Sequence, residues 1–310
     1  MNTNESHAGA DHDDNDNDND NDNDNDDGSS AARIASLHAH PLKSGAVVNL
    51  DAVLLTTTGF EHDRRWMLVD PQGDFHSQRE HPRMALLRAV VDGGRLHVQA
   101  PGCAPLSVPI EPPVARPVRV DVWGDRFEAL AVDPAADRWF SDFLGEPARL
   151  VVTHPAMHRP SSRARTGDIE ALNGFADGYP ILVISTASLA DLNRRLADQN
   201  LPPVEMARFR PNLVLDGLDA HAEDNLDELH ISTDDGPVVL RLVKPCPRCP
   251  MPDVDPATGV RGVEPGLTLM GYRADPRLDG AITFGMNAVI VDGIGRTLRV
   301  GQGVRGTVRF

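Results

Sequence analysis

The sequence predicts a mainly β protein with a few helices, and three observations support this fold class. Short apolar, β-branched runs recur along most of the chain. Glycine-containing turns separate several of these runs, which is typical of antiparallel hairpins. Amphipathic helical spacing is confined to two stretches. Many short strands joined by such turns favour a barrel or a sandwich over a parallel sheet.

The first 32 residues are expected to form a disordered acidic tail. Residues 1–30 hold eleven acidic side chains and no Lys or Arg, and an Asn-Asp repeat covers residues 14–27. Such a run has nothing to bury, and its like charges keep it extended. It also lacks the glycine and the final glutamate of a calcium-binding loop. The net charge of −16 comes mostly from this tail, and the mildly acidic remainder gives no sign of nucleic-acid binding.

Cysteine usage and the N-terminus indicate a cytoplasmic protein. A chain of 310 residues with three cysteines has no disulfide framework, which favours a reducing compartment. Residues 1–5 lack the basic start and apolar core of a signal peptide. No apolar run approaches the length that spans a membrane, so we expect no membrane association.

Residues 33–150 are expected to fold mostly into antiparallel strands. The β segments predicted in this half are 34–37, 47–55, 67–69, 86–91, 95–99, 118–122 and 126–132. Two of them flank a glycine-containing turn at 92–94 and two others flank one at 123–125, so each pair predicts a hairpin. A helix follows, with Asp133 as its cap, Pro134 in its first turn and Gly145 at its end.

Residues 151–310 are expected to return to short strands after one more helix. Segment 157–168 is rich in Arg, Ser and His without periodicity and is predicted to be a surface loop. Ser185 or Thr186 caps the second helix, in which leucines recur at helical spacing. The β segments predicted in this half are 150–152, 180–184, 213–215, 238–243, 288–291, 297–300 and 304–310.

Two of the three cysteines, Cys246 and Cys249, lie together on a proline-rich stretch directly after the predicted strand 238–243. We expect this stretch to be a stiff turn. The flanking Lys244 and Arg248 favour a thiolate, which can attack, form a disulfide or bind a soft metal.

Local chemistry alone leaves the role of these cysteines open. A zinc knuckle needs a second pair of ligands at a defined spacing, and none follows. A thioredoxin-type pair needs a helix N-terminus, but Pro250, Pro252 and Pro256 oppose a helix. A cysteine protease needs an evident histidine partner. A thiolate that binds a soft metal within a cofactor remains, beside a buried structural cysteine.

Six motifs in one order resemble the MOSC family, and within it the mitochondrial amidoxime-reducing component and its bacterial relatives. The resemblance covers the chain from about residue 33 to its end. The motifs are Pro41-Leu42-Lys43-Ser44, Asp63-Arg64-Arg65-Trp66, Phe209-Arg210-Pro211-Asn212, Cys246-Pro247-Arg248-Cys249, Val254-Asp255-Pro256-Ala257-Thr258-Gly259 and Phe284-Gly285-Met286-Asn287.

The resemblance implies a MOSC N-terminal β-domain at 33–150 and a MOSC β-barrel domain at 151–310. It implies a molybdenum-dependent oxidoreductase that carries the molybdenum cofactor, Mo-molybdopterin. Its substrates would be small N-hydroxylated compounds such as amidoximes and hydroxylamines. Electrons would come from an external ferredoxin-, flavin- or cytochrome-type reductase. Nothing in the sequence corresponds to the pyridoxal-phosphate domain of the cofactor sulfurase, and we expect a monomer.

The family pattern makes Cys249 the molybdenum ligand and the catalytic residue, because a thiolate donates strongly to an oxidised metal. Arginine suits the cofactor's phosphate, and asparagine suits the donors and acceptors of its pterin. The other positions that the resemblance places at the cofactor are Lys43, Ser44, Arg64, Arg210, Asn212, Pro247, Arg248 and Asn287.

The chain also departs from the family pattern. Where relatives often have a hydroxyl residue, this sequence has Asp177-Gly178-Tyr179-Pro180, so Gly178 and Tyr179 stand where a hydroxyl contact is common. No cysteines are present for the iron–sulfur domain of some bacterial relatives. Two alternative functions stay open: a non-catalytic carrier of molybdenum cofactor or sulfur, and a structural or interaction β-barrel.

Overall fold

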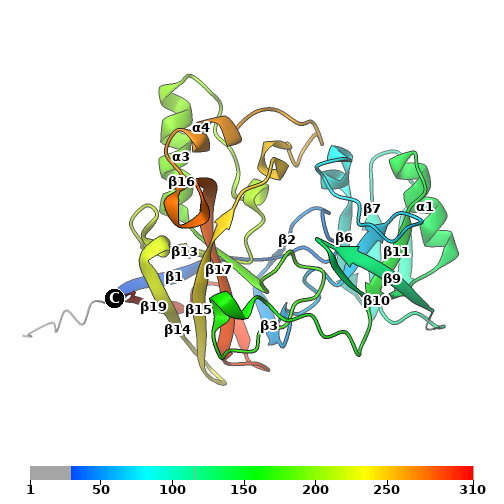
Figure 1. Ribbon diagram of the computed structural model, residues 1–310, viewed down its shortest axis with the longest axis horizontal. Helices are drawn as coiled ribbons and strands as arrows, with labels where there is room; N and C mark the ends of the chain where they lie inside the picture. Colours follow the sequence, from blue (N-terminus) through cyan, green and yellow to red (C-terminus); the bar gives the residue numbers. More distant parts are fainter. Residues whose placement is uncertain (1–28, 115, 310) are drawn as a thin grey trace, which may run out of the picture.

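The computed structural model describes residues 29–114 and 116–309 (Figure 1). It confirms a mainly β fold with a few helices, in which a closed barrel is joined to a second group of sheets. Of the predicted acidic tail, residues 1–28 lie outside the described part of the chain. The first strand already begins at Ser29, earlier than the expected start at Arg33.

Within the described chain, seven strands form a closed barrel, because the first of these seven strands, β12, pairs with the last, β17. Only β12 and β13 run parallel, and every other neighbouring pair in the barrel is antiparallel. In order around the barrel the strands are β12 (Ile181–Ser185), β13 (Leu213–Asp216), β1 (Ser29–Ala39), β19 (Gly303–Val308), β14 (Leu226–Thr233), β15 (Gly236–Pro247) and β17 (Ala281–Asp292).

Strand β1 comes from the start of the chain but belongs to the barrel. It pairs with β13 on one side and β19 on the other, and Ile34 and Leu37 are fully buried in the barrel core. Every other barrel strand lies after residue 180. The division into units at 33–150 and 151–310 therefore stays a proposal, in which β1 is the strand that ties the two units together.

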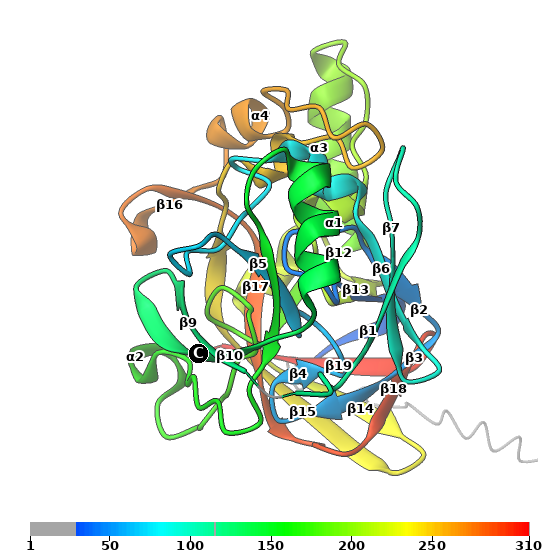
Figure 2. The same ribbon diagram turned by 90° about the vertical axis from the view of Figure 1, so that its right-hand side faces the viewer.

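The second group of sheets lies beside the barrel, to the right in Figure 1. Figure 2 shows α1 in front, with β6 and β7 on one side and β9 and β10 on the other. Its strands are β5 (Trp66–Val69), β11 (Arg149–Thr153), β10 (Asp125–Ala131) and β9 (Pro117–Val122) in one sheet, and β6 (Arg88–Asp92), β7 (Arg95–Gln99) and β8 (Leu106–Pro109) in another. Smaller elements are β18 (Thr297–Arg299), β3 (Ala52–Thr56) and β4 (Gly59–Phe60) in a third sheet, β2 (Val48–Leu50) on β1, and β16 (Ala274–Asp275) on β17.

Both predicted helices form, and their caps explain their ends. In α1 (Pro134–Leu144) the Asp133 side chain accepts from the Ala135 amide at 2.6 Å, and Gly145 ends the helix at φ 80°. In α3 (Thr186–Asp198) the predicted capping residue is Ser185, which accepts from the Ser188 amide at 3.0 Å. The remaining helices are α2 (Arg163–Thr166), α4 (Gly266–Met270), η1 (Pro82–Leu86), η2 (Met206–Phe209), η3 (Ala222–Asn225), η4 (Met251–Asp253) and η5 (Pro276–Leu278).

Two local predictions were wrong. The stretch expected to be a turn at Lys244 is still strand, because bulges in the pairing of β15 with β17 admit the prolines up to Pro247. Segment 157–168 is not all surface loop: it contains α2, and Arg159 is buried with its guanidinium on the carbonyls of Gly174 and Ala176. Among the described residues, no helix is long and apolar enough to cross a membrane.

Candidate cofactor site

One cavity lies between the barrel and the second group of sheets, and it brings together residues from seven separate parts of the chain. All nine predicted site residues line it. They are Lys43, Ser44, Arg64, Arg210, Asn212, Pro247, Arg248, Cys249 and Asn287. The cavity therefore joins positions that are up to 244 residues apart in sequence, from the turn after β1 to the middle of β17.

Three of these residues sit on tight turns with backbone conformations unusual for side-chain-bearing residues. Ser44, Arg64 and Arg210 have φ values of 63°, 44° and 59°. Non-glycine residues in this left-handed region are uncommon and concentrate at functional sites. All three residues line the same cavity, so the unusual backbone conformations occur where the chain places polar groups in the cavity wall.

Lys43 brings a buried positive charge to the wall of the cavity. Its Nζ donates to the Phe175 carbonyl at 2.8 Å and forms an ion pair with Asp177, and it lies 4.8 Å from the ring centre of Phe75. Burial lowers the pKa of Lys43, and the charge of Asp177 offsets part of that effect. The side chain of Asp177 is 64% exposed, so solvent screens much of this attraction.

Arg64 is held in place by three groups. Nη1 lies 2.5 Å from the Asp63 carboxylate and 3.1 Å from Asn212 Oδ1, and Nη2 donates to the Arg210 carbonyl at 3.1 Å. Asn212 Oδ1 also accepts from the Leu182 amide at 3.1 Å, and Nδ2 donates to the His38 carbonyl at 3.3 Å. Asn212 is thus largely engaged by protein groups, and its amide fixes Arg64 at the cavity.

Asp63 and His40 form a buried pair behind Arg64. Burial alone would raise the pKa of Asp63, but the charge of Arg64 and hydrogen bonding with His40 hold it well below its usual value. Burial, followed by the positive charges of Arg210 and Arg64, lowers the pKa of His40 well below 6.5. The site thus keeps Asp63 ionised and His40 neutral.

Positive charge exceeds negative charge around the cavity. Lys43, Arg64, Arg79, Arg210 and Arg248 line it, while Asp177 is the only carboxylate among the lining residues that the structure describes. Burial, and next the charge of Arg64, lowers the pKa of Arg210. A group whose cationic form is disfavoured in this way gains from a bound anion. The cavity is therefore suited to a negatively charged ligand such as a phosphate ester.

Both cysteines line the cavity, but their contacts differ. Cys246 lies in β15, and its Sγ is 3.2 Å from Nη1 of Arg248. Cys249 follows the end of β15, lines the cavity, and its thiol has no hydrogen-bond partner among the described residues. A half-buried thiol with no protein partner is available to a soft metal.

These features fit the group that the sequence motifs imply. A cationic wall can hold the cofactor's phosphate, and the Cys249 thiol can ligate its metal. Nε of Arg248 is buried without a partner within the described chain, which leaves a donor available next to that cysteine.

Sequence reasoning missed several residues of the cavity wall. Arg79 stacks on Trp123, with its guanidinium carbon 4.1 Å from the ring centre, and Trp123 Nε1 donates to Asp177 at 3.1 Å. Phe75, Ser77 and Arg79 line the cavity without having been expected there, whereas Asp177, Gly178 and Tyr179, which also line it, belong to the stretch where the sequence departs from the family pattern. The tip of the β9–β10 hairpin carries Trp123, and nothing in its local sequence distinguishes it from an ordinary turn residue.

Comparison with known proteins agrees with this architecture. The chain matches the MOSC N-terminal beta barrel domain over residues 31–147 and the MOSC domain over residues 171–305. It is similar to mitochondrial amidoxime-reducing component 1 of Homo sapiens, with 35% identity over 254 residues that cover 78% of this chain and 73% of the human protein.

Two further relatives extend the comparison. Mitochondrial amidoxime reducing component 2 of Rattus norvegicus is 33% identical over 287 residues, 87% of this chain and 82% of the rat protein. Molybdenum cofactor sulfurase of Solanum lycopersicum is 31% identical over 278 residues, 83% of this chain but 33% of the tomato protein. The chain therefore belongs to the MOSC family, with the MOSC N-terminal and MOSC domains that it shares with these relatives.

Proposed function

We propose that this protein is a molybdenum-cofactor-dependent oxidoreductase that reduces N-hydroxylated compounds, amidoximes and hydroxylamines, to the parent amidines and amines. The observation that carries the proposal is the Cys249 thiol, which has no hydrogen-bond partner in the described part of the chain and lies in a cavity whose wall is cationic. Relatives named for amidoxime reduction support the reaction type. The overall change takes two electrons and two protons, breaks the N–O bond and releases water.

Different residues of the cavity would bind different parts of the cofactor. Lys43, Arg64 and Arg210 would bind its phosphate, and Ser44 and Pro247 would shape the wall. Asn212 keeps Arg64 in position through the 3.1 Å contact. Asn287 lies on β17 beside the cavity and would meet the pterin. When bound, the cofactor supplies a metal that passes two electrons from a donor to the substrate.

The single experiment that tests this proposal is turnover by cofactor-loaded protein. The full chain is produced in cells that make molybdenum cofactor, and its molybdenum content is measured. An aromatic amidoxime is then supplied with reduced methyl viologen as artificial electron donor. We expect about one molybdenum per chain and formation of the amidine. Bound molybdenum without turnover would favour a cofactor or sulfur carrier, and no molybdenum would favour an interaction barrel.

An outside electron donor is part of the proposal. The Gly-x-Gly-x-x-Gly run at residues 301–306 enters strand β19 and does not open a helix, so it is no dinucleotide-binding motif. Because the sequence also has too few cysteines for a cluster, NADH or NADPH alone should not drive the reaction. A ferredoxin-, flavin- or cytochrome-type reductase should restore it. Direct use of NADH by the purified protein would contradict this part. Cytoplasmic location and a monomeric state stay predictions, which cell fractionation and light scattering test.

A further inference from the structure

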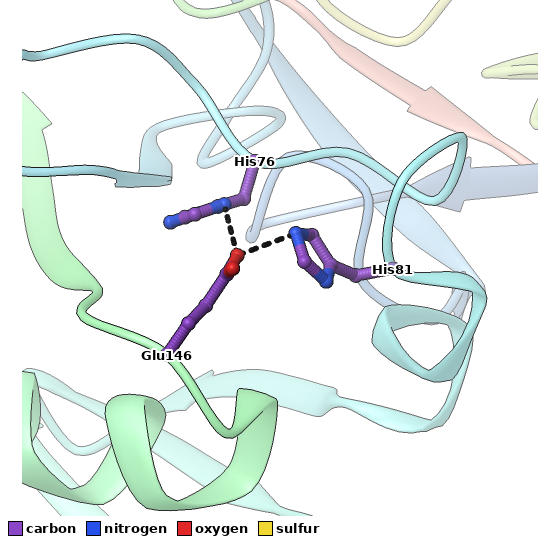
Figure 3. A group of neighbouring side chains, drawn as sticks. All are labelled: His76, His81 and Glu146. Atoms are coloured by element: carbon purple, nitrogen blue, oxygen red, sulfur yellow. Dashed lines mark ion pairs between the residues drawn. The ribbon is translucent and has the colours of Figure 1, made fainter.

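A second group of chemically active side chains lies outside the cofactor cavity. His76 follows β5, His81 directly precedes η1, and Glu146 follows α1 and its terminal Gly145. Figure 3 shows both imidazole rings turned toward the same carboxylate. None of the three lines the cofactor cavity, and the proposed reaction uses none of them.

The donor atoms of this cluster converge on one point. Glu146 Oε1 lies 2.6 Å from His81 Nε2 and 3.3 Å from His76 Nδ1. The two rings are 5.0 Å apart and inclined at 77°, and all three ligand atoms lie within 4.8 Å of one another. Ligand atoms around a tetrahedral Zn²⁺ are roughly 3.4 Å apart. Shifts of about 1 Å at the side-chain ends would therefore admit an ion.

The protein fixes which nitrogen of His76 faces the cluster. His76 Nε2 lies 3.3 Å from the Pro147 carbonyl, which can only accept, so Nε2 carries a proton. In the neutral ring, Nδ1 then presents its lone pair to the Glu146 carboxylate, another acceptor. The lone pair of His76 Nδ1 and the Glu146 carboxylate repel each other, but a cation between them would attract both. A backbone carbonyl that orients the imidazole in this way is the usual support of a metal-binding histidine.

Exposure of the three side chains leaves one side of the cluster open. The His76 side chain is only 9% exposed, whereas those of His81 and Glu146 are 21% and 42% exposed. An ion could enter from the side of Glu146 and keep at least one position for water or another ligand.

We propose that His76, His81 and Glu146 form a binding site for Zn²⁺. Two imidazole nitrogens and one carboxylate oxygen are a donor set of zinc sites that keep an open position, whereas Mg²⁺ and Ca²⁺ prefer all-oxygen ligands. The site would clamp segment 76–81 to the end of α1. Because Ser77 and Arg79 of this segment line the cofactor cavity, the ion would also steady that part of the cavity wall.

The test measures Zn²⁺ affinity of the full chain by competition with a coloured chelator. Cys103→Ser, Cys246→Ser and Cys249→Ser are present in every sample, so that thiolates do not compete for the ion. His81→Gln and Glu146→Gln are the test variants, because both side chains are partly exposed and their loss should spare the fold. His158→Gln is the matched control, since His158 lies 3.2 Å from Glu170 in a pair that no second imidazole joins among residues 29–114 and 116–309.

We expect the parent to bind one equivalent of Zn²⁺ tightly. Each test variant should lose at least about 100-fold in Zn²⁺ affinity, and the control should bind like the parent. Co²⁺ in the same site should show ligand-field bands without sulfur charge transfer. Failure of the parent protein to bind one equivalent of Zn²⁺ tightly would overturn the proposal. So would test variants that bind as tightly as the parent, because the cluster would then be a hydrogen-bonded network only. An equal loss in His158→Gln would assign the binding to scattered surface histidines.

Discussion

Nη1 of Arg248 lies 3.2 Å from Sγ of Cys246, so the guanidinium is tied to the first cysteine of the pair and not to Cys249. Its Nη2 donates to the Phe209 carbonyl at 2.9 Å, and the guanidinium carbon lies 5.5 Å from the Phe209 ring centre. Cys246 therefore belongs to the scaffold that holds Arg248 at the cavity. Cys249 keeps its thiol for a ligand, and the two cysteines should respond differently to the same substitution.

Cys249→Ser replaces a soft thiolate by a hydroxyl that stays protonated near neutral pH. Since Lys43, Arg64 and Arg210 remain, part of the cofactor should be retained, but turnover should fall by more than about 100-fold. Cys246→Ser keeps an acceptor for Arg248 and should cost less than about tenfold. Molybdenum content and amidoxime reduction are measured side by side for both variants.

Two results would contradict this assignment. Equal loss of activity in the two variants would indicate that the cysteines act together as a redox or zinc pair. An active Cys249→Ser enzyme would end the role of Cys249 as metal ligand, even if its molybdenum content were normal.

Asn212 is predicted to be a stability residue as well as a site residue. Asn212→Ala removes the acceptor for Arg64 and the Leu182 amide and the donor to the His38 carbonyl, in buried or partly buried surroundings. Groups left without partners there should lower the free energy of unfolding by about 2–4 kcal/mol. Asn49→Ala, which removes an exposed contact with the His38 ring at 2.9 Å, is the control and should cost less than about 1 kcal/mol. Urea unfolding checks both, and equal costs would refute the positioning role.

Local chemistry was enough to predict much of the fold. Turn preferences predict the hairpins at residues 93 and 123. Capping preferences predict the helix that begins after Asp133 and the helix that Ser185 caps. The closure of the barrel could not be predicted in this way. Pairing of β1 with β13 and β19 depends on strands far away in the sequence, and local patterns carry no information on such contacts.

Local sequence patterns could not predict the cavity either. Its nine expected residues were predicted from motif resemblance and not from spacing, because turns and strands far apart in the sequence supply them. Trp123 and Arg79 have no motif, and only folding brings their side chains together. The continuation of β15 past Val243 was missed because bulges, which cannot be recognised from the local sequence, tolerate the prolines.

Gly285 shows why the motif that ends in Asn287 needs glycine. A Cβ at Gly285 would lie 2.5 Å from Ile184 Cγ1 and 2.7 Å from the Val183 carbonyl of the neighbouring β12. Gly285→Ala should therefore destabilise the barrel by more than about 3 kcal/mol. Gly295→Ala is the matched control: its φ of 85° is close to the 79° of Gly285, but no atom is within 4 Å of the added carbon, so it should cost about 1 kcal/mol. Similar melting temperatures for the two variants would contradict the close contact.

His40 should make stability depend on pH between about 5 and 7. Burial, then the charges of Arg210 and Arg64, hold the pKa of His40 well below 6.5, although Asp63 offsets part of this effect. As pH falls through 6.5, the unfolded chain takes up a proton that folded His40 does not. The unfolded state then binds more protons, so stability is full above 6.5 and declines below it, by at most about 1.4 kcal/mol per pH unit for one group.

His40→Gln tests this expectation through the free energy of urea unfolding at pH 7.5 and at pH 5.5. The decline between the two pH values should be smaller in His40→Gln than in the parent, whatever the variant costs in absolute stability. His38 and His62, whose pKa values burial also lowers, contribute equally to both proteins and cancel in the comparison. His158→Gln, whose side chain is 62% exposed, should keep the decline of the parent. An unchanged decline in His40→Gln would show that the imidazole takes up its proton as readily in the folded protein as in the unfolded chain.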